Sequence, residues 1–253
     1  MRRLLALWVV LALSASGACG GADGEPDLGT LTVFAASSLQ PVLTSLEDRI
    51  ERELSLPIQF SFSSSPVAAR QVVEGAPADL LITADQQSMD VALSEEVVES
   101  PTLVARSHLA LIVSKGNPEA VAGLADLSRA ELSVVLCDPD VPCGRLAAAL
   151  LREAGVTAAV DSLEENAAAA VGKVALGEAD VTIGYVTDVI ARQGDLQQVA
   201  SDQTDSEELV ARYLAAVVRS SPSRANARRL VELFQSPTIR SHLEAAGFLI
   251  GAS

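Results

Sequence analysis

The chain has 253 residues, with 33 Asp and Glu against 18 Lys and Arg, which gives a formal net charge of −15. This balance argues against nucleic acid as a partner, because neutralising phosphates takes clustered Lys and Arg. An anionic ligand would also meet a repulsive overall field, so local, directed donors would have to hold it. Hydrophobic residues make up 49% of the chain, enough for a sizeable core.

The first 18 residues have the layout of a secretory signal. Arg2 and Arg3 form a short positive region, and an uncharged apolar run follows over residues 4–13. This run is shorter than the roughly 20 apolar residues that a membrane-spanning helix needs. We therefore expect residues 1–18 to be a signal peptide.

The segment after the apolar run resembles a bacterial lipobox. Residues 16–19 read Ser-Gly-Ala-Cys, with Ser16 where Leu is usual, and predict lipidation of Cys19. The alternative is a plain signal peptide cleaved near Ala18. Residues 19–29 are small, Gly-rich and acidic, and we expect them to form a flexible tether.

Two further cysteines, Cys137 and Cys143, form an even pair in an exported chain, which permits a disulfide. A metal pair or two free thiols are the alternatives, and the local sequence offers no His to complete a metal set. A bridge over so short a loop would stiffen it.

Apolar strand-like runs alternate with amphipathic helices, which predicts an α/β fold. The expected strands are 31–34, 58–62, 80–82, 109–113, 133–136, 181–183 and 210–217. The expected helices start at residues 39, 66, 145, 166, 223 and 238, and one more follows Asp85. Ser65 and Pro66 are assigned to the N-cap and first position of the second helix. We expect two lobes joined by crossing strands, with residues 30–108 and 214–253 in the first and 109–213 in the second.

Two serine turns are the candidate binding elements: residues 34–39 and 62–66. Each lies between the carboxyl end of a predicted buried strand and a helix start, where ligands bind in open α/β sheets. Helix N-termini offer free N–H groups and a partial positive charge, which suit an anion. The alternative is that these serines are ordinary N-caps.

Seven motifs of this chain resemble those of a known protein family. They are Val33–Leu39, Ser63–Ser65 with Ala69–Gln71, Gly75–Asp85, Asp138–Gly144, Gly177–Asp180, Ile183–Asp188 and Ala246–Phe248. In this order they resemble the molybdate/tungstate-binding family of periplasmic proteins over nearly the whole exported part. The resemblance implies a two-lobed type II periplasmic-binding-protein fold, in which each lobe is a mostly parallel sheet flanked by helices.

The resemblance also implies a ligand shell around molybdate or tungstate. The hydroxyl and N–H groups of Ser38 and Ser65, the backbone N–H groups of Cys143 and Ala167, and the Tyr185 hydroxyl would bind the oxyanion. No cofactor and no free metal cation are expected. The implied partners are an ABC permease with its ATPase subunits. We expect a monomer, periplasmic or held by lipid at the outer face of the cytoplasmic membrane.

Such a shell would contain only neutral donors, which favours a fully ionised dianion. Hydrogen phosphate would confront its O–H with donors alone, at a cost of about 1–3 kcal/mol. Sulfate is smaller and would lose optimal contacts, whereas molybdate and tungstate are nearly isosteric. A Cys137–Cys143 disulfide would preorganise the loop that supplies the Cys143 N–H.

Other function classes fit less well. A serine hydrolase would lack the Gly-x-Ser-x-Gly elbow and would have only His108 or His242 as its base. There is no phosphate-binding Gly-x-x-x-x-Gly-Lys loop. A binding protein for sulfate, phosphate or a chelated metal, and a purely structural surface protein, are the remaining alternatives. The scattered Asp79, Asp85, Asp138, Asp180 and Asp188 are expected to be structural, with Asp85 capping the helix after it. We therefore expect binding rather than catalysis.

Overall fold

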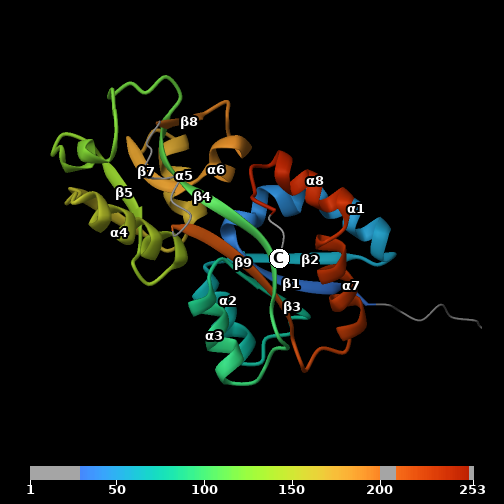
Figure 1. The fold of residues 1–253 in the computed structure, drawn as a ribbon. Coiled ribbons are helices and arrows are strands. Elements are labelled where there is room, and N and C mark those ends of the chain that lie inside the picture. The colour runs from blue at the N-terminus through green and yellow to red at the C-terminus, as the bar shows by residue number, and fades with distance from the viewer. Residues whose placement is uncertain (1–28, 200–208, 251–253) are drawn as a thin grey trace, which may run out of the picture.

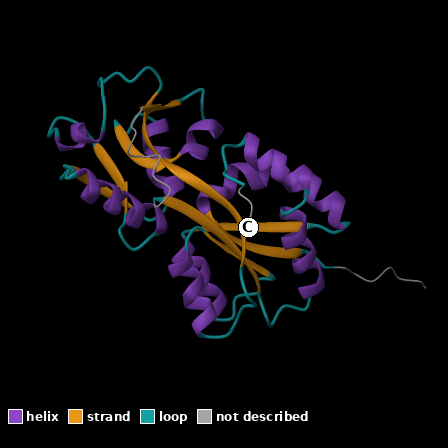
Figure 2. Cartoon of the chain, in the orientation of Figure 1, coloured by secondary structure: helices purple, strands orange, loops and turns teal. Residues whose placement is uncertain are grey.

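The computed structural model describes residues 29–199 and 209–250 (Figure 1). The expected signal peptide, Cys19 and nearly all of the expected tether lie outside these residues. Within them, no helix combines the length and the apolar character needed to cross a membrane. Helices surround a single twisted sheet that runs through both halves of the molecule (Figure 2).

The first lobe is built on three parallel strands. They are β1 (Leu31–Ala36), β2 (Ile58–Ser63) and β3 (Leu80–Thr83), with β1 between the other two. Its helices are α1 (Gln40–Leu54, after the 3-10 turn η1, Ser37–Leu39), α2 (Ser65–Val73), α3 (Gln86–Ser94), α7 (Arg224–Phe234) and α8 (Pro237–Ala245). The C-terminal helices return to this lobe, where Arg229 of α7 donates to the carbonyl of Leu54 at the end of α1.

The two faces of this part of the sheet bury different helices. Leu80 and Ile82 of β3 pack into the cluster that contains α1 and α7, whereas Leu81 packs against α2 and α3. This alternation follows from the two-residue period of a strand. All three side chains are fully buried, which matches the continuous apolar run in the sequence.

Two long strands connect the lobes, and Figure 1 shows both running between them. They are β4 (Thr102–Ser114) and β9 (Val210–Val217), which pair antiparallel with each other. The β4 strand pairs with β9 up to His108 and with β7 (Val181–Tyr185) from Leu109 onward. The expected residue limits of the lobes fall inside these two strands and remain a prediction.

The second lobe repeats the plan of the first. Its remaining elements are η2 (Leu124–Ser128), β5 (Val134–Cys137), α4 (Pro142–Ala154), β6 (Val160–Glu164), α5 (Ala167–Ala175), α6 (Val186–Ala191) and β8 (Leu196–Val199). The strand order is β2-β1-β3-β9-β4 in the first lobe and β6-β5-β7-β4-β8 in the second. In both, three parallel strands are followed by an antiparallel crossing strand. The predicted two-lobed α/β architecture is confirmed.

An equivalent aspartate supports each lobe. Asp79, before β3, accepts the N–H of Thr32 at 2.7 Å, and Asp180, before β7, accepts the N–H of Ser133 at 2.7 Å. Asp79 also accepts the Ser221 hydroxyl at 2.6 Å. These carboxylates tie strand ends together, so their expected structural role is confirmed.

Several predicted boundaries were wrong. Ser64 is the N-cap of α2 and Ser65 is already its first residue, so the prediction was one residue late. Helix α4 begins at Pro142 rather than at Arg145, because proline fits the first turn, where its missing N–H costs little. Strand β4 begins at Thr102, seven residues before the predicted start. The prediction also omitted β6, β8 and α6.

Candidate functional site

A small pocket lies where the carboxyl ends of the strands in the two lobes face each other. It is lined by Ala36, Ser37, Ser38, Ser63, Ser64, Ser65, Ala84, Val141, Pro142, Cys143, Asn166, Ala167 and Tyr185. It has room only for a small ligand, whereas the two adjoining crevices beside α1 are wider. All five predicted binding residues are in the lining, and no lining residue carries a charge. The pocket therefore suits a small ligand held by neutral groups.

The lobes contribute to this pocket in the same way. Ser38 and Ser65 follow β1 and β2 at the starts of η1 and α2, and Cys143 and Ala167 follow β5 and β6 at the starts of α4 and α5. The first N–H groups of a helix have no carbonyl partner within it and carry a partial positive charge. Helix starts from both lobes thus line one pocket, an arrangement that suits an anion.

Ser65 is held so that its proton is free. Its Oγ accepts the backbone N–H of Ala84 at 2.9 Å, and the side chain is buried. A backbone N–H can only donate, so this contact does not use the Ser65 proton. The hydroxyl can therefore donate into the pocket.

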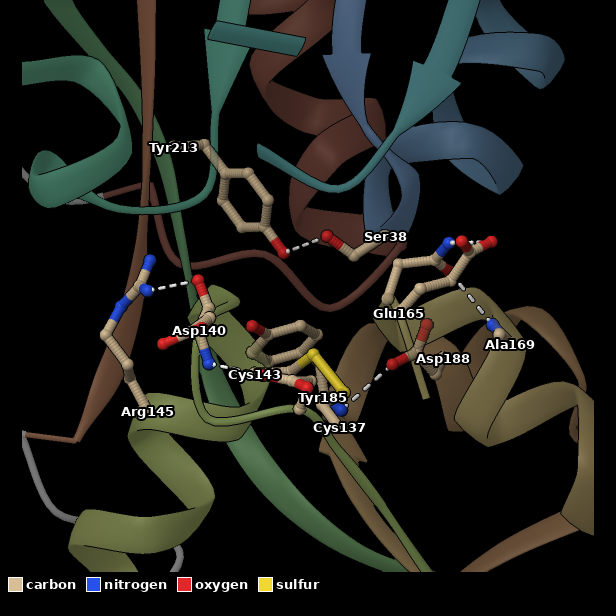
Figure 3. The surroundings of a disulfide bond; sticks show 12 residues. Ser38, Cys137, Asp140, Cys143, Arg145, Glu165, Ala169, Tyr185, Asp188 and Tyr213 are labelled. Atoms are coloured by element: carbon tan, nitrogen blue, oxygen red, sulfur yellow. Dashed lines mark hydrogen bonds between the residues drawn. A yellow bond between two sulfur atoms is a disulfide. The ribbon is translucent and has the colours of Figure 1, made fainter. Parts of the chain in front are cut away.

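Ser38 has a different partner. Its Oγ lies 3.0 Å from the hydroxyl of Tyr213, a residue of the crossing strand β9, and both side chains are buried (Figure 3). No sequence motif points to Tyr213. It lies 175 residues from Ser38 in the sequence and outside all seven motifs, so only the fold brings the two together.

The Cys143 turn is tightly constrained. The structure contains a disulfide between Cys137, the last residue of β5, and Cys143 in the first turn of α4, with a Cα–Cα distance of 5.8 Å. A Cβ on the next residue, Gly144, would lie 1.9 Å from the carbonyl oxygen of Asp138. Glycine is therefore required for this close approach of the backbone. The disulfide and the glycine together fix the start of α4 at the pocket wall.

Tyr185 closes the pocket from the end of β7. The residue is 1% exposed, and burial raises the pKa of its hydroxyl well above the ordinary value, so the hydroxyl keeps its proton. Its backbone N–H donates to Asp188 Oδ2 at 2.9 Å (Figure 3). Burial raises the pKa of Asp188 to about 7, and the Tyr185 N–H and the charge of Arg192 act in the opposite direction. Asp188 therefore anchors the backbone that carries the tyrosine.

The remaining candidate residues serve other purposes. Asp85 caps α3 as expected, accepting the N–H of Ser88 at 2.9 Å, and it also pairs with Arg145 of the other lobe. Asp138 accepts the N–H of Asp140 within its own turn at 2.8 Å. Neither His108 nor His242 lines the pocket beside the serines. Among the described residues, no group of three or more His, Cys, Asp and Glu could hold a metal ion.

The comparison with protein families agrees with this geometry. Residues 31–249 match the model of the bacterial extracellular solute-binding protein family. The chain belongs to this family. Nearly all of the described fold, and the whole pocket, lie within the matched residues of this solute-binding protein.

Individual relatives fit the predicted resemblance. The molybdate-binding protein ModA of Mycobacterium tuberculosis is 29% identical over 247 residues, which cover 97% of this chain and 94% of the relative. The solved structure of the Azotobacter vinelandii periplasmic molybdate-binding protein superposes with a TM-score of 0.74 at 19% identity, covering 88% of this chain and 100% of the other. The resemblance to molybdate-binding proteins, first inferred from the motifs, is thereby confirmed.

A sulfate-binding relative shares the fold as well. The SubI protein of Mycobacterium tuberculosis superposes with a TM-score of 0.76 at 18% identity, covering 87% of this chain and 86% of SubI. At this identity the likeness is one of fold alone. The ligand of this solute-binding protein must therefore be argued from its own pocket.

Proposed function

We propose that this solute-binding protein captures a single tetrahedral dianion, molybdate or its near isostere tungstate, and delivers it to an ABC importer. The observation that carries the proposal is the pocket between the lobes, which is small, uncharged and lined by serines and helix starts. The molybdate-binding relatives at 29% identity support the choice of ligand. Binding without chemical change is the function that such a donor set serves best.

The five proposed ligand groups are the residues already described. The hydroxyls of Ser38, Ser65 and Tyr185 and the N–H groups of Cys143 and Ala167 line the same pocket. All are neutral donors at ordinary pH, because burial keeps the Tyr185 phenol protonated. Fixed donors in a buried pocket bind a dianion without a cationic side chain, since each hydrogen bond to a charged acceptor is strong there.

The same arrangement discriminates among anions. Hydrogen phosphate carries a proton that would find only donors, and an unpaired buried group costs about 1–3 kcal/mol. Sulfate has no such proton, so only its smaller size separates it from molybdate. Sulfate is therefore the second candidate ligand, supported by the fold shared with SubI.

Delivery to an importer would follow from closure of the lobes. The anion contacts groups from both lobes, so it binds the closed state more tightly and shifts the population toward that state. The strands β4 and β9, which cross between the lobes, are the proposed hinge. A permease would then recognise the closed shape. A monomeric protein held by lipid on Cys19 at the outer face of the cytoplasmic membrane suits this role.

Isothermal titration of the mature, unlipidated protein tests the proposal against molybdate, tungstate, sulfate and phosphate. We expect one site that binds molybdate and tungstate alike, with sulfate and phosphate far weaker. Tighter binding of sulfate or phosphate would overturn the proposed identity of the ligand and leave the closure mechanism in place. Failure to bind any oxyanion would refute the anion site itself.

A further inference from the structure

The contact between Ser38 and Tyr213 bears on how the proposed site selects its anion, and the inference below rests on the proposed function. A serine hydroxyl has one proton and two lone pairs, so it can face an anion only by donating. If Ser38 spent its proton on Tyr213, its lone pairs would face the anion and repel it. The direction of this one hydrogen bond therefore decides whether Ser38 helps or opposes binding.

The surroundings of Tyr213 determine that direction. Among the described residues, the Tyr213 hydroxyl has one hydrogen-bond partner, the Oγ of Ser38 at 3.0 Å. Tyr213 is 0% exposed, so a hydroxyl proton pointing elsewhere would be buried without an acceptor. Buried polar groups are rarely left unpaired in this way, because it costs free energy. Donation from Tyr213 to Ser38 satisfies both hydroxyls and leaves the Ser38 proton free.

Ser65 shows the same arrangement without ambiguity. Its Oγ accepts the N–H of Ala84 at 2.9 Å, a group that can only donate. Ser65 and Ser38 thus each accept from one donor, the Ala84 N–H in the first case and the Tyr213 O–H in the second. In both cases the serine proton is left to point into the pocket.

Tyr213 is also well placed to hold this orientation. It lies on β9 opposite Ala105 of β4, in the strand pair that connects the lobes. Its ring packs edge-on against Phe248, with centroids 5.3 Å apart and planes at 75°. A ring fixed by a sheet and by an aromatic contact keeps its hydroxyl at one point. Figure 3 shows this hydroxyl directed at Ser38.

We propose that Tyr213 is a positioning residue for anion selection, which donates to Ser38 Oγ and so turns the Ser38 proton toward the ligand. It does not itself contact the anion. It makes Ser38 a pure donor, and this excludes anions that carry a proton of their own. Without the Tyr213 hydroxyl, Ser38 can rotate and accept a proton from hydrogen phosphate.

The first test is the substitution Tyr213→Phe, which keeps the ring and its packing on Phe248. We expect molybdate affinity to fall about 10-fold, the order for one lost partner of a buried hydrogen bond. The ratio of molybdate to phosphate affinity at pH 6–7 should fall about as much or more, because the pocket gains an acceptor. A merely structural role for Tyr213 would weaken all anions alike and leave that ratio unchanged, which would overturn the inference.

A double-mutant cycle gives the sharper test. If Tyr213 acts only through Ser38, the double variant Ser38→Ala with Tyr213→Phe should bind molybdate within about 2-fold of Ser38→Ala alone. The matched control combines Tyr213→Phe with Ser65→Ala, where the two losses should multiply. If the affinity losses of Ser38→Ala and Tyr213→Phe multiply in the double variant, the inference is overturned while the proposed function stands. Failure of the wild-type protein to bind oxyanions would overturn the proposed function and this inference with it.

A second measurement covers the case in which Tyr213→Phe does not fold. The chain has two tyrosines, so 3-fluorotyrosine in the Tyr185→Phe protein labels Tyr213 alone. We expect its fluorine resonance to shift when Ser38 is replaced by Ala, because the hydroxyl loses its acceptor. A resonance unchanged by Ser38→Ala would show that the two hydroxyls are not bonded and would overturn the inference.

Discussion

Asp85 and Arg145 join the two lobes by an ion pair beside the pocket. The Arg145 Nε donates to Asp85 Oδ2 at 2.9 Å, and a terminal nitrogen of the same guanidinium contacts the same oxygen. The other oxygen of Asp85 caps α3 through the N–H of Ser88. Arg145 also donates to the carbonyl of Asp140 at 2.5 Å, so both partners are held by their own lobes. Because its partners belong to different lobes, the pair would break if the lobes moved apart.

We therefore predict that Asp85→Asn weakens anion binding by about 5-fold, which corresponds to the roughly 1 kcal/mol of a partly exposed pair. Asparagine still caps α3, so the folded first lobe should be unaffected. Titration at rising ionic strength measures the effect, and the wild-type affinity should fall toward that of the variant as salt screens the pair. The control is Glu99→Gln, since Glu99 pairs with Arg228 within the first lobe. Equal losses in both variants would contradict a role in closure.

Loss of the Cys137–Cys143 disulfide should destabilise the protein and weaken binding. Chain entropy for so short a loop gives about 2 kcal/mol of stabilisation. Urea unfolding of the Cys137→Ser, Cys143→Ser protein should show this loss, and anion affinity should fall several-fold because the start of α4 is less constrained. The Cys143 N–H itself remains. An affinity equal to that of the oxidised wild type would refute preorganisation by the disulfide.

Tyr185→Phe should weaken molybdate binding by about 1–3 kcal/mol, the order for removing one partner of a buried hydrogen bond. The ring is retained, so we expect little change in the melting temperature of the free protein. Thr182→Val is a matched control, because Thr182 lies on the same strand and its buried hydroxyl has no hydrogen-bond partner among the described residues. Its affinity should equal that of the wild type. If both variants bind alike, Tyr185 is not a ligand.

Asp188 predicts a specific pH dependence of stability. Its pKa in the folded protein, about 7, lies above the ordinary 3.8, so the folded state binds this proton more tightly than the unfolded state. Its contribution to stability is full below about pH 4 and is lost as the pH rises toward 7, with a slope of up to about 1.4 kcal/mol per pH unit. The unfolding free energy of the wild type, taken relative to that of Asp188→Asn, should therefore fall as the pH rises across this window. A difference in unfolding free energy that stays constant from pH 4 to 8 would contradict a raised pKa for this buried carboxyl.

The lipid anchor is tested by mass spectrometry of the protein purified from membranes. We expect the mature chain to begin at Cys19 with attached acyl groups, because the residues before it resemble a lipobox. An unmodified first residue, or cleavage at another position, would leave a soluble exported protein instead. In that case, Cys19→Ser should not change the amount of the protein found in the membrane fraction.

Local sequence patterns predicted those elements whose own residues favour a helix or a strand. Residues 80–82 of β3 are continuously apolar and buried, and the α1 helix shows apolar residues at helical spacing after Pro41. In contrast, β6 reads Val-Asp-Ser-Leu-Glu, and all five of its residues are exposed or half-buried. Its strand conformation follows from pairing with β5, which no local pattern reveals.

The sequence by itself determined the α/β class and the serine turns, because each depends on neighbours within a few positions. The resemblance of its motifs to a known family gave Ser38, Ser65, Cys143 and Tyr185, and the helix start after Asn166 gave Ala167. Only the tertiary structure decided the contacts of Ser38 with Tyr213 and of Asp85 with Arg145, which span 175 and 60 residues. Such contacts leave no periodic signal, since a tyrosine in a buried strand and an arginine on a helix are common. Their partners are fixed by how β9 crosses between the lobes and by how the lobes face each other. The groups that orient and close the site therefore emerge only when the chain is folded.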